Sequence, residues 1–96
     1  MSGRKRKNRH IDADHSGICF KPCGIQRVDL QKVILAEDEM EAIRLADLEG
    51  LYQQECSQKM GISRTTFSRL IESARKKIAD ALINTKALKI RMIEND

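Results

Sequence analysis

The sequence predicts a mainly α domain in which three helices, two of them arranged as a helix-turn-helix, are flanked by short extended segments. Three observations predict this fold: a long amphipathic stripe, a short helical stretch closed by Gly61, and brief apolar runs on either side of the helices. At 96 residues the chain has room for one domain. A domain of this length buries roughly 60–65% of its unfolded surface, which disfavours a large internal active site.

The strongest periodic signal predicts a helix that begins after Ser63 and ends near Asn84. Ser63 supplies a side-chain oxygen suited to an N-cap. At about 100° per residue, seven apolar positions fall within about 60° of Phe67 on a helical wheel. They are Phe67, Leu70, Ile71, Ala74, Ile78, Ala81 and Leu82. This stripe predicts one buried face along the whole helix.

Two shorter helices are expected before it. Residues 37–39 are acidic, which favours a helix start because of the helix dipole, and Asp38 and Glu41 have capping-box spacing. This first helix should end before Gly50, and a second helix should cover residues 53–60. The apolar positions that share one face of the first helix are Ala42, Ile43, Leu45 and Ala46.

The remaining segments are short and extended. Apolar runs at residues 18–22, 33–35 and 87–93 read as brief strands or extensions. The chain therefore divides into a basic flexible arm at 1–16, an extended N-terminal segment at 17–36, the helix-turn-helix domain at 37–84 and an extended C-terminal segment at 85–96. We expect the two extended segments to be able to pair with each other.

Charge alternates along the chain. Residues 1–29 hold seven Lys/Arg and three Asp/Glu, residues 30–50 hold two and six, and residues 51–96 hold nine and five. The net charge is +4, and two basic regions flank an acidic one. This distribution favours a polyanionic partner met by two separate surfaces.

The spacing around Gly61 is typical of a helix-turn-helix. Such a unit needs a small residue where the helices touch and a residue that tolerates a left-handed turn four positions later. Ser57 and Gly61 fill these positions, and Phe67 is among the apolar residues that close the core. The opposite face of the last helix is polar, as a helix that enters a DNA major groove requires.

We therefore predict double-stranded DNA as the partner. The expected groove and phosphate contacts of the helical domain are Ser63, Arg64, Thr65, Thr66, Ser68, Arg69, Arg75 and Lys76. The expected contacts of the flexible arm are Arg4, Lys5, Arg6, Lys7 and Arg9. A single helix-turn-helix reads few base pairs, so a homodimer is also expected.

Residues 37–82 resemble the helix-turn-helix of region 4 of bacterial sigma factors, and the whole chain is similar to the domain-of-unknown-function 134 family of small predicted DNA-binding proteins. The second resemblance rests on F-K-P-C-G at 20–24, E-A-I-R-L-A-D-L-E-G-L at 41–51, M-G-I-S-R-T-T-F-S-R at 60–69, S-A-R-K-K-I-A-D-A-L at 73–82 and K-A-L-K-I at 86–90. These resemblances imply a sigma-region-4-like domain, DNA binding in transcriptional regulation and a contact with RNA polymerase.

Two other function classes remain open. Cys19 and Cys23, with His15 and His10 upstream, make a weak candidate for a metal- or redox-responsive site. An acidic face could instead bind a basic protein partner. Its residues are Glu37, Glu39, Glu41, Asp47 and Glu49.

Catalysis is not expected, because the sequence has no glycine-rich phosphate loop and no evident nucleophile–base pair. We expect no cofactor. The chain has no long apolar run of the kind that spans a membrane, and its three scattered cysteines are typical of a reducing, cytoplasmic compartment.

Overall fold

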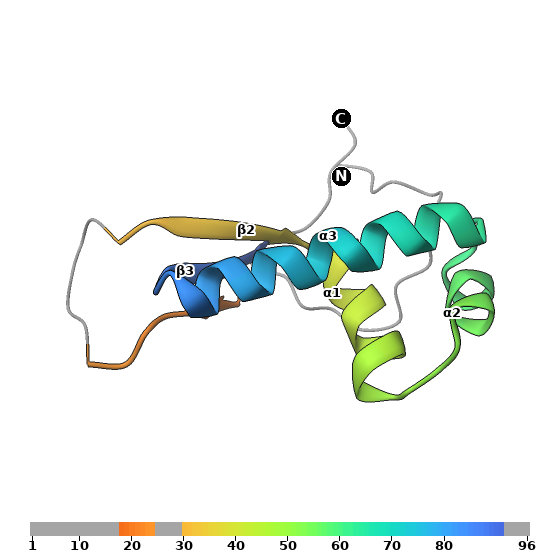
Figure 1. Cartoon of the computed structure of the whole chain (residues 1–96), viewed down its shortest axis with the longest axis horizontal. Coiled ribbons are helices and arrows are strands. Elements are labelled where there is room, and N and C mark those ends of the chain that lie inside the picture. The colour runs from red at the N-terminus through yellow and green to blue at the C-terminus, as the bar shows by residue number, and fades with distance from the viewer. Residues whose placement is uncertain (1–17, 25–29, 92–96) are drawn as a thin grey trace, which may run out of the picture.

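The computed structural model describes residues 18–24 and 30–91, which form three α-helices, a π-helical segment and a three-stranded sheet. In chain order the elements are β1 (Cys19–Phe20), β2 (Lys32–Ala36), α1 (Glu37–Ile43), η1 (Arg44–Leu48), α2 (Gln53–Met60), α3 (Arg64–Ile83) and β3 (Ala87–Arg91). In Figure 1, α3 spans the molecule, with the sheet beside its C-terminal half and α2 at its N-terminal end. The three predicted helices and the extended segments on either side of them are confirmed.

The sheet joins the two ends of the described chain. Its strand order is β1-β3-β2, so the last strand is the central one. β3 pairs antiparallel with β1, with Phe20 opposite Leu88, and parallel with β2, with Ile34 opposite Lys89. The sequence predicted that terminal segments could pair, but not the parallel pairing of β2 with β3.

Two apolar clusters follow each other along the buried face of α3. The first joins α1, η1, α2 and α3 and contains Ala42, Leu45, Cys56, Met60, Phe67 and Ile71. The second joins the sheet to α3 and contains Leu35, Ala74 and Ile90. Because α3 contributes to both clusters, it holds the helical unit against the sheet.

α1 begins at the acidic run 37–39, as predicted, but its capping residues differ from the prediction. The N-cap is Ala36 rather than Asp38, and the backbone N–H of Ala36 donates to Oε1 of Glu39 at 2.9 Å. β2 ends at Ala36 and runs directly into α1, so the capping box lies two residues before the predicted one. Glu39 thus takes the capping role that the sequence gave to Glu41.

The acidic face suggested as a site for a basic protein partner is covered where it belongs to α1. α1 contacts α3, β2 and β3, and the acidic side chains at the start of the helix are buried. The buried acidic residues are Glu37, Asp38, Glu39 and Glu41.

The predicted inner stripe of α3 holds over most of the helix but fails at its end. Phe67, Ile71, Ala74 and Ala81 are buried, whereas Leu82 is 74% exposed. The position of Leu82 on the wheel is correct, but at the end of α3 too little of the neighbouring structure covers it. The helix ends as predicted, with Asn84 at its C-cap.

Among the described residues, no helix is long and apolar enough to cross a membrane. The basic arm, including Arg4, Lys5, Arg6, Lys7 and Arg9, lies outside the described residues, as do His10 and His15.

Candidate nucleic-acid interface

The connection between α2 and α3 is a tight turn built around Gly61. Gly61 has a left-handed backbone with φ 70° and ψ 34°, which glycine adopts without steric cost. The N–H of Gly61 donates to the carbonyl of Gln58 at 3.2 Å, and the N–H of Ile62 donates to that of Ser57 at 3.0 Å. These bonds satisfy the last carbonyls of α2 and turn the chain sharply into α3.

Ser63 caps the N-terminus of α3, as predicted. Its Oγ accepts a hydrogen bond from the backbone N–H of Thr66 at 3.0 Å. The hydroxyls of Ser63 and Thr66 also lie 3.0 Å apart in a hydrogen bond. Thr66 is half-buried, and its hydroxyl is engaged in the cap. It is therefore less available to contact a ligand than its exposed neighbours Arg64 and Thr65.

The small residue predicted at the helix contact is buried. Ser57 is 3% exposed, and its Oγ donates to the carbonyl of Gln54 at 2.8 Å, so its hydroxyl is satisfied within α2. The adjacent Cys56 is also buried, and its thiol donates to the carbonyl of Leu51 at 3.6 Å. Burial raises the pKa of the Cys56 thiol, which supports a neutral packing role.

The outer side of the N-terminal half of α3 is polar and open. Its side chains border an open hollow of about 430 Å³ together with the first residue of α2. The hollow is lined by Gln53, Arg64, Thr65, Ser68 and Arg69. Four of these five residues belong to the predicted contact set. Gln53 was missed because its place beside α3 depends on how the helices cross.

The two arginines of this surface have exposed side chains. Both Arg64 and Arg69 are exposed, and neither forms an ion pair or side-chain hydrogen bond within residues 18–24 and 30–91. The first turn of α3 also contains no acidic residue. Positive charge there opposes the helix dipole, so Arg64 does not help the helix to form.

Arg75 and Lys76 differ in their surroundings. The Arg75 guanidinium donates from Nε and Nη2 to the carboxylate of Asp47, at 3.1 and 2.7 Å. These hydrogen bonds hold the pKa of Asp47 below its ordinary value. Lys76 is exposed and has no such partner within the described chain. Of these two predicted contact residues, Arg75 is therefore paired within the protein and Lys76 is available.

A buried carboxylate fixes α3 to α1. Glu39 accepts hydrogen bonds from Lys77 Nζ at 2.8 Å and Ser73 Oγ at 2.6 Å, in addition to that from Ala36. Burial alone would raise the pKa of Glu39, but these three donors together lower it. The sequence did not reveal this contact, because its partners are 34 and 38 residues away.

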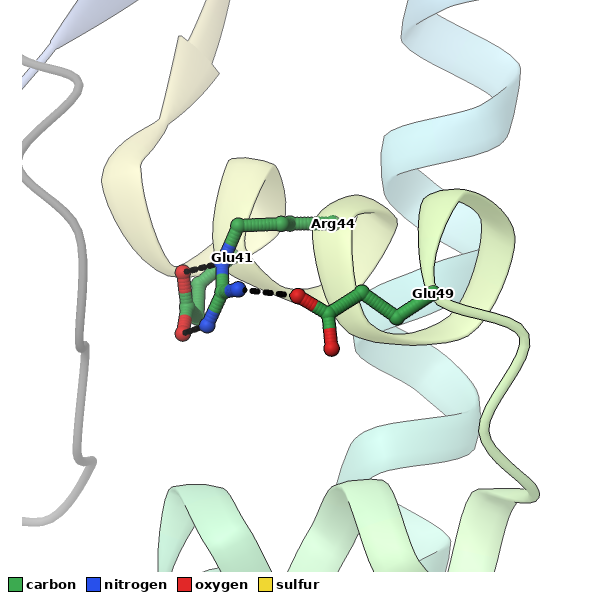
Figure 2. A network of polar contacts seen from close by, with 3 residues as sticks. All are labelled: Glu41, Arg44 and Glu49. Carbon is green, nitrogen blue, oxygen red and sulfur yellow. Dashed lines mark hydrogen bonds and ion pairs between the residues drawn. The ribbon is translucent and has the colours of Figure 1, made fainter.

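A second charged network lies where α1 passes into η1 (Figure 2). Nε and Nη2 of Arg44 donate to the two carboxylate oxygens of Glu41, at 3.0 and 2.7 Å, and Nη1 donates to Glu49 at 2.6 Å. Arg44 is the first residue of η1, so the network spans the change from α to π geometry. Together with the Asp47–Arg75 pair, it leaves no continuous free acidic face on α1 and η1.

The two thiols predicted as weak metal candidates lie within the described residues, whereas their candidate partners His10 and His15 do not. Cys19 and Cys23 are exposed and free of disulfides. Within the described ranges, no three His, Cys, Asp or Glu side chains are grouped so that they could hold a metal ion.

Comparisons with known proteins place the chain among similar sequences. The profile of a family described as "Protein of unknown function DUF134" matches residues 1–94. The chain is 47% identical over 89 residues to a UPF0251 protein of Prosthecochloris aestuarii, covering 93% of this chain and 57% of that protein. It is 49% identical over 87 residues to one of Thermoanaerobacter pseudethanolicus, covering 91% of this chain and 74% of that protein. No solved structure matches the chain.

Proposed function

The chain belongs to the family described as "Protein of unknown function DUF134", and we propose that it binds double-stranded DNA and regulates transcription. In this proposal α2, the Gly61 turn and α3 act as a helix-turn-helix like that of sigma region 4. The N-terminal half of α3 enters the major groove.

The observation that carries the proposal is the contrast between the two sides of α3. Phe67 and Ile71 face the core, whereas Arg64 and Arg69 point to solvent without an internal partner among the described residues. Arginine pairs with the O6 and N7 atoms of guanine in the major groove, and serine or threonine hydroxyls bond to bases or phosphates. An exposed, rigid helix with this set of donors suits groove reading.

The N-terminus of α3 adds a phosphate-binding element to the proposal. Ser63 satisfies the N–H of Thr66, which leaves the preceding N–H groups of the first turn for a ligand. Such amides and the positive end of the helix dipole favour a phosphate. The lack of acidic side chains in this turn removes the repulsion that a phosphate would otherwise meet.

We assign the groove contacts to Arg64, Thr65, Ser68 and Arg69, with Ser63 and Gln53 beside them. Lys76 is the proposed contact to the DNA phosphate backbone farther along α3. Arg75 can make such a contact only if its ion pair with Asp47 breaks. The basic arm from Arg4 to Arg9 is proposed as a further phosphate contact.

Arg69→Ala tests base reading directly. If Arg69 pairs with guanine, the variant should lose about 1–3 kcal/mol of binding free energy and relax the sequence preference at one position. Binding-site selection on random duplexes, followed by titration of the selected site, measures both effects. Arg91→Ala is the matched control, because it removes the same exposed side chain from β3. Equal behaviour of the two variants would remove Arg69 from the interface.

Lys76→Ala tests a contact that does not read sequence. We expect weaker binding to all duplexes alike and a plot of log K against log salt whose slope falls by about 1 unit. Lys89→Ala, another exposed lysine on β3, should leave the slope unchanged. If wild-type affinity does not depend on salt, the proposed electrostatic interface is wrong.

A further inference from the structure

A second, apolar groove lies at the other end of α3 from the proposed DNA-binding surface. It has a volume of about 370 Å³ and is lined by residues of all three strands together with α1 and α3. Phe20 and Leu88 border it from the sheet, and Ile78 and Leu82 border it from α3. In Figure 1 this is the region where the segment that contains β1 runs beside the C-terminal half of α3.

The lining of the groove includes two lysines. Lys21 and Lys86 are among its lining residues, together with the hydroxyl-bearing Thr85, and no described residue of the lining has a carboxylate. Lys86 forms an ion pair with Asp80 at 3.2 Å, and Lys21 has no ion pair within the described parts of the chain. The groove thus combines a mostly apolar lining with two lysine side chains.

The size of the groove suits a small molecule. Ligand pockets typically measure about 300–1,000 Å³, and a cavity of about 150 Å³ accommodates benzene. We propose that the groove binds a small amphipathic carboxylate, with its apolar chain along Phe20, Ile78 and Leu82 and its head group between Lys21 and Lys86.

A second copy of the chain fits the groove less well. In a two-fold dimer the same patch meets itself, so the lysines of both copies would approach each other. An anionic ligand instead neutralises them, and its chain covers the exposed side chains of Phe20 and Leu82. This inference does not depend on DNA binding.

Octanoate is a suitable probe, and the protein is small enough for amide NMR titration. Saturable shifts should occur at residues that line the groove, including Phe20, Ile78 and Leu88, and not at Gln53 or Arg64. For a ligand of about ten heavy atoms we expect a dissociation constant on the order of 1 mM. Octanoate should bind more tightly than octanol, and octylammonium more weakly than either.

Two exposed neighbours on α3 provide a matched pair of variants. Leu82 lines the groove, whereas the adjacent Ile83, which is 78% exposed, does not. Leu82→Glu should weaken octanoate binding by roughly tenfold or more, since it sets a carboxylate against the ligand. Ile83→Glu makes the same chemical change outside the groove and should alter binding by less than about twofold. The NMR spectra also report whether both variants are folded.

Lys21→Ala separates the head group from the chain, because it should weaken octanoate binding but leave octanol binding unchanged. The proposal is overturned by an absence of saturable shifts or by equal losses in the Leu82 and Ile83 variants. It is also overturned if sedimentation shows a dimer that Leu82→Glu dissociates and octanoate does not, because a second copy then fills the groove. None of these outcomes changes the DNA titrations, so the two proposals fail separately.

Discussion

Replacing Phe67 by alanine should lower the free energy of unfolding by about 3–5 kcal/mol. Phe67 is fully buried within the cluster that joins α1, η1, α2 and α3, and it is the largest of the fully buried side chains. The substitution removes the apolar surface of the ring and leaves a cavity that rigid helices cannot close. Since small domains are stable by only about 5–15 kcal/mol, the loss is a large part of the total.

Urea denaturation followed by far-UV circular dichroism measures this change. Phe20→Ala is the matched control, because Phe20 is 55% exposed on β1 and should cost no more than about 1 kcal/mol. A similar cost for both variants would contradict the central role of Phe67. The Phe67 variant should also lose DNA affinity under conditions in which part of it is unfolded, whereas the Phe20 variant should not.

Glu39→Gln should be the second most damaging change, with an expected cost of about 2–4 kcal/mol. The buried carboxylate accepts hydrogen bonds from Lys77, Ser73 and Ala36, and an amide cannot accept all three as well. The change also leaves the Lys77 ammonium without its counter-ion at the α1–α3 contact. Glu72→Gln, at an exposed position on α3, should change stability by less than about 0.5 kcal/mol.

The same carboxylate should make stability depend on pH. The pKa of Glu39 is lower in the folded protein than its ordinary value of 4.5. Its contribution is therefore fully present above pH 4.5 and is lost as the pH falls through the folded-state pKa. Unfolding measured from neutral to acidic pH should show a smaller acid-induced loss in Glu39→Gln than in the wild type. Parallel curves would contradict this assignment.

The helices could be predicted because their signals are local. Ser63, Gly61 and the stripe through Phe67 each act within a few residues, and the structure shows the cap, the left-handed turn and the buried face that they predict. The exposed positions of Arg64 and Arg69 follow from the same periodicity. The polar surface of α3 could therefore be predicted from the sequence.

Contacts between distant parts of the chain could not be predicted in this way. A run of acidic residues at a helix start has the same local pattern whether it faces solvent or lies beneath a neighbouring helix. Only the tertiary fold brings Lys77 and Ser73 to Glu39. Leu82 likewise lies at its expected angle on α3, but no neighbouring element of the described chain covers its side chain. Helical periodicity predicts which face of a helix is apolar, but not how far along the helix the core extends.

The order of strands in the sheet also affects how the protein is made. Because β3 lies between β1 and β2, neither of these earlier strands can form its sheet hydrogen bonds until β3 has been synthesised. During synthesis on the ribosome, the residues of the cluster around Phe67 are all translated before β3, but Leu35 on β2 lacks its neighbour Ile90 until β3 is released. Completion of the domain is thus coupled to translation of residues 87–91, and a nascent chain stalled before them has an unfinished sheet.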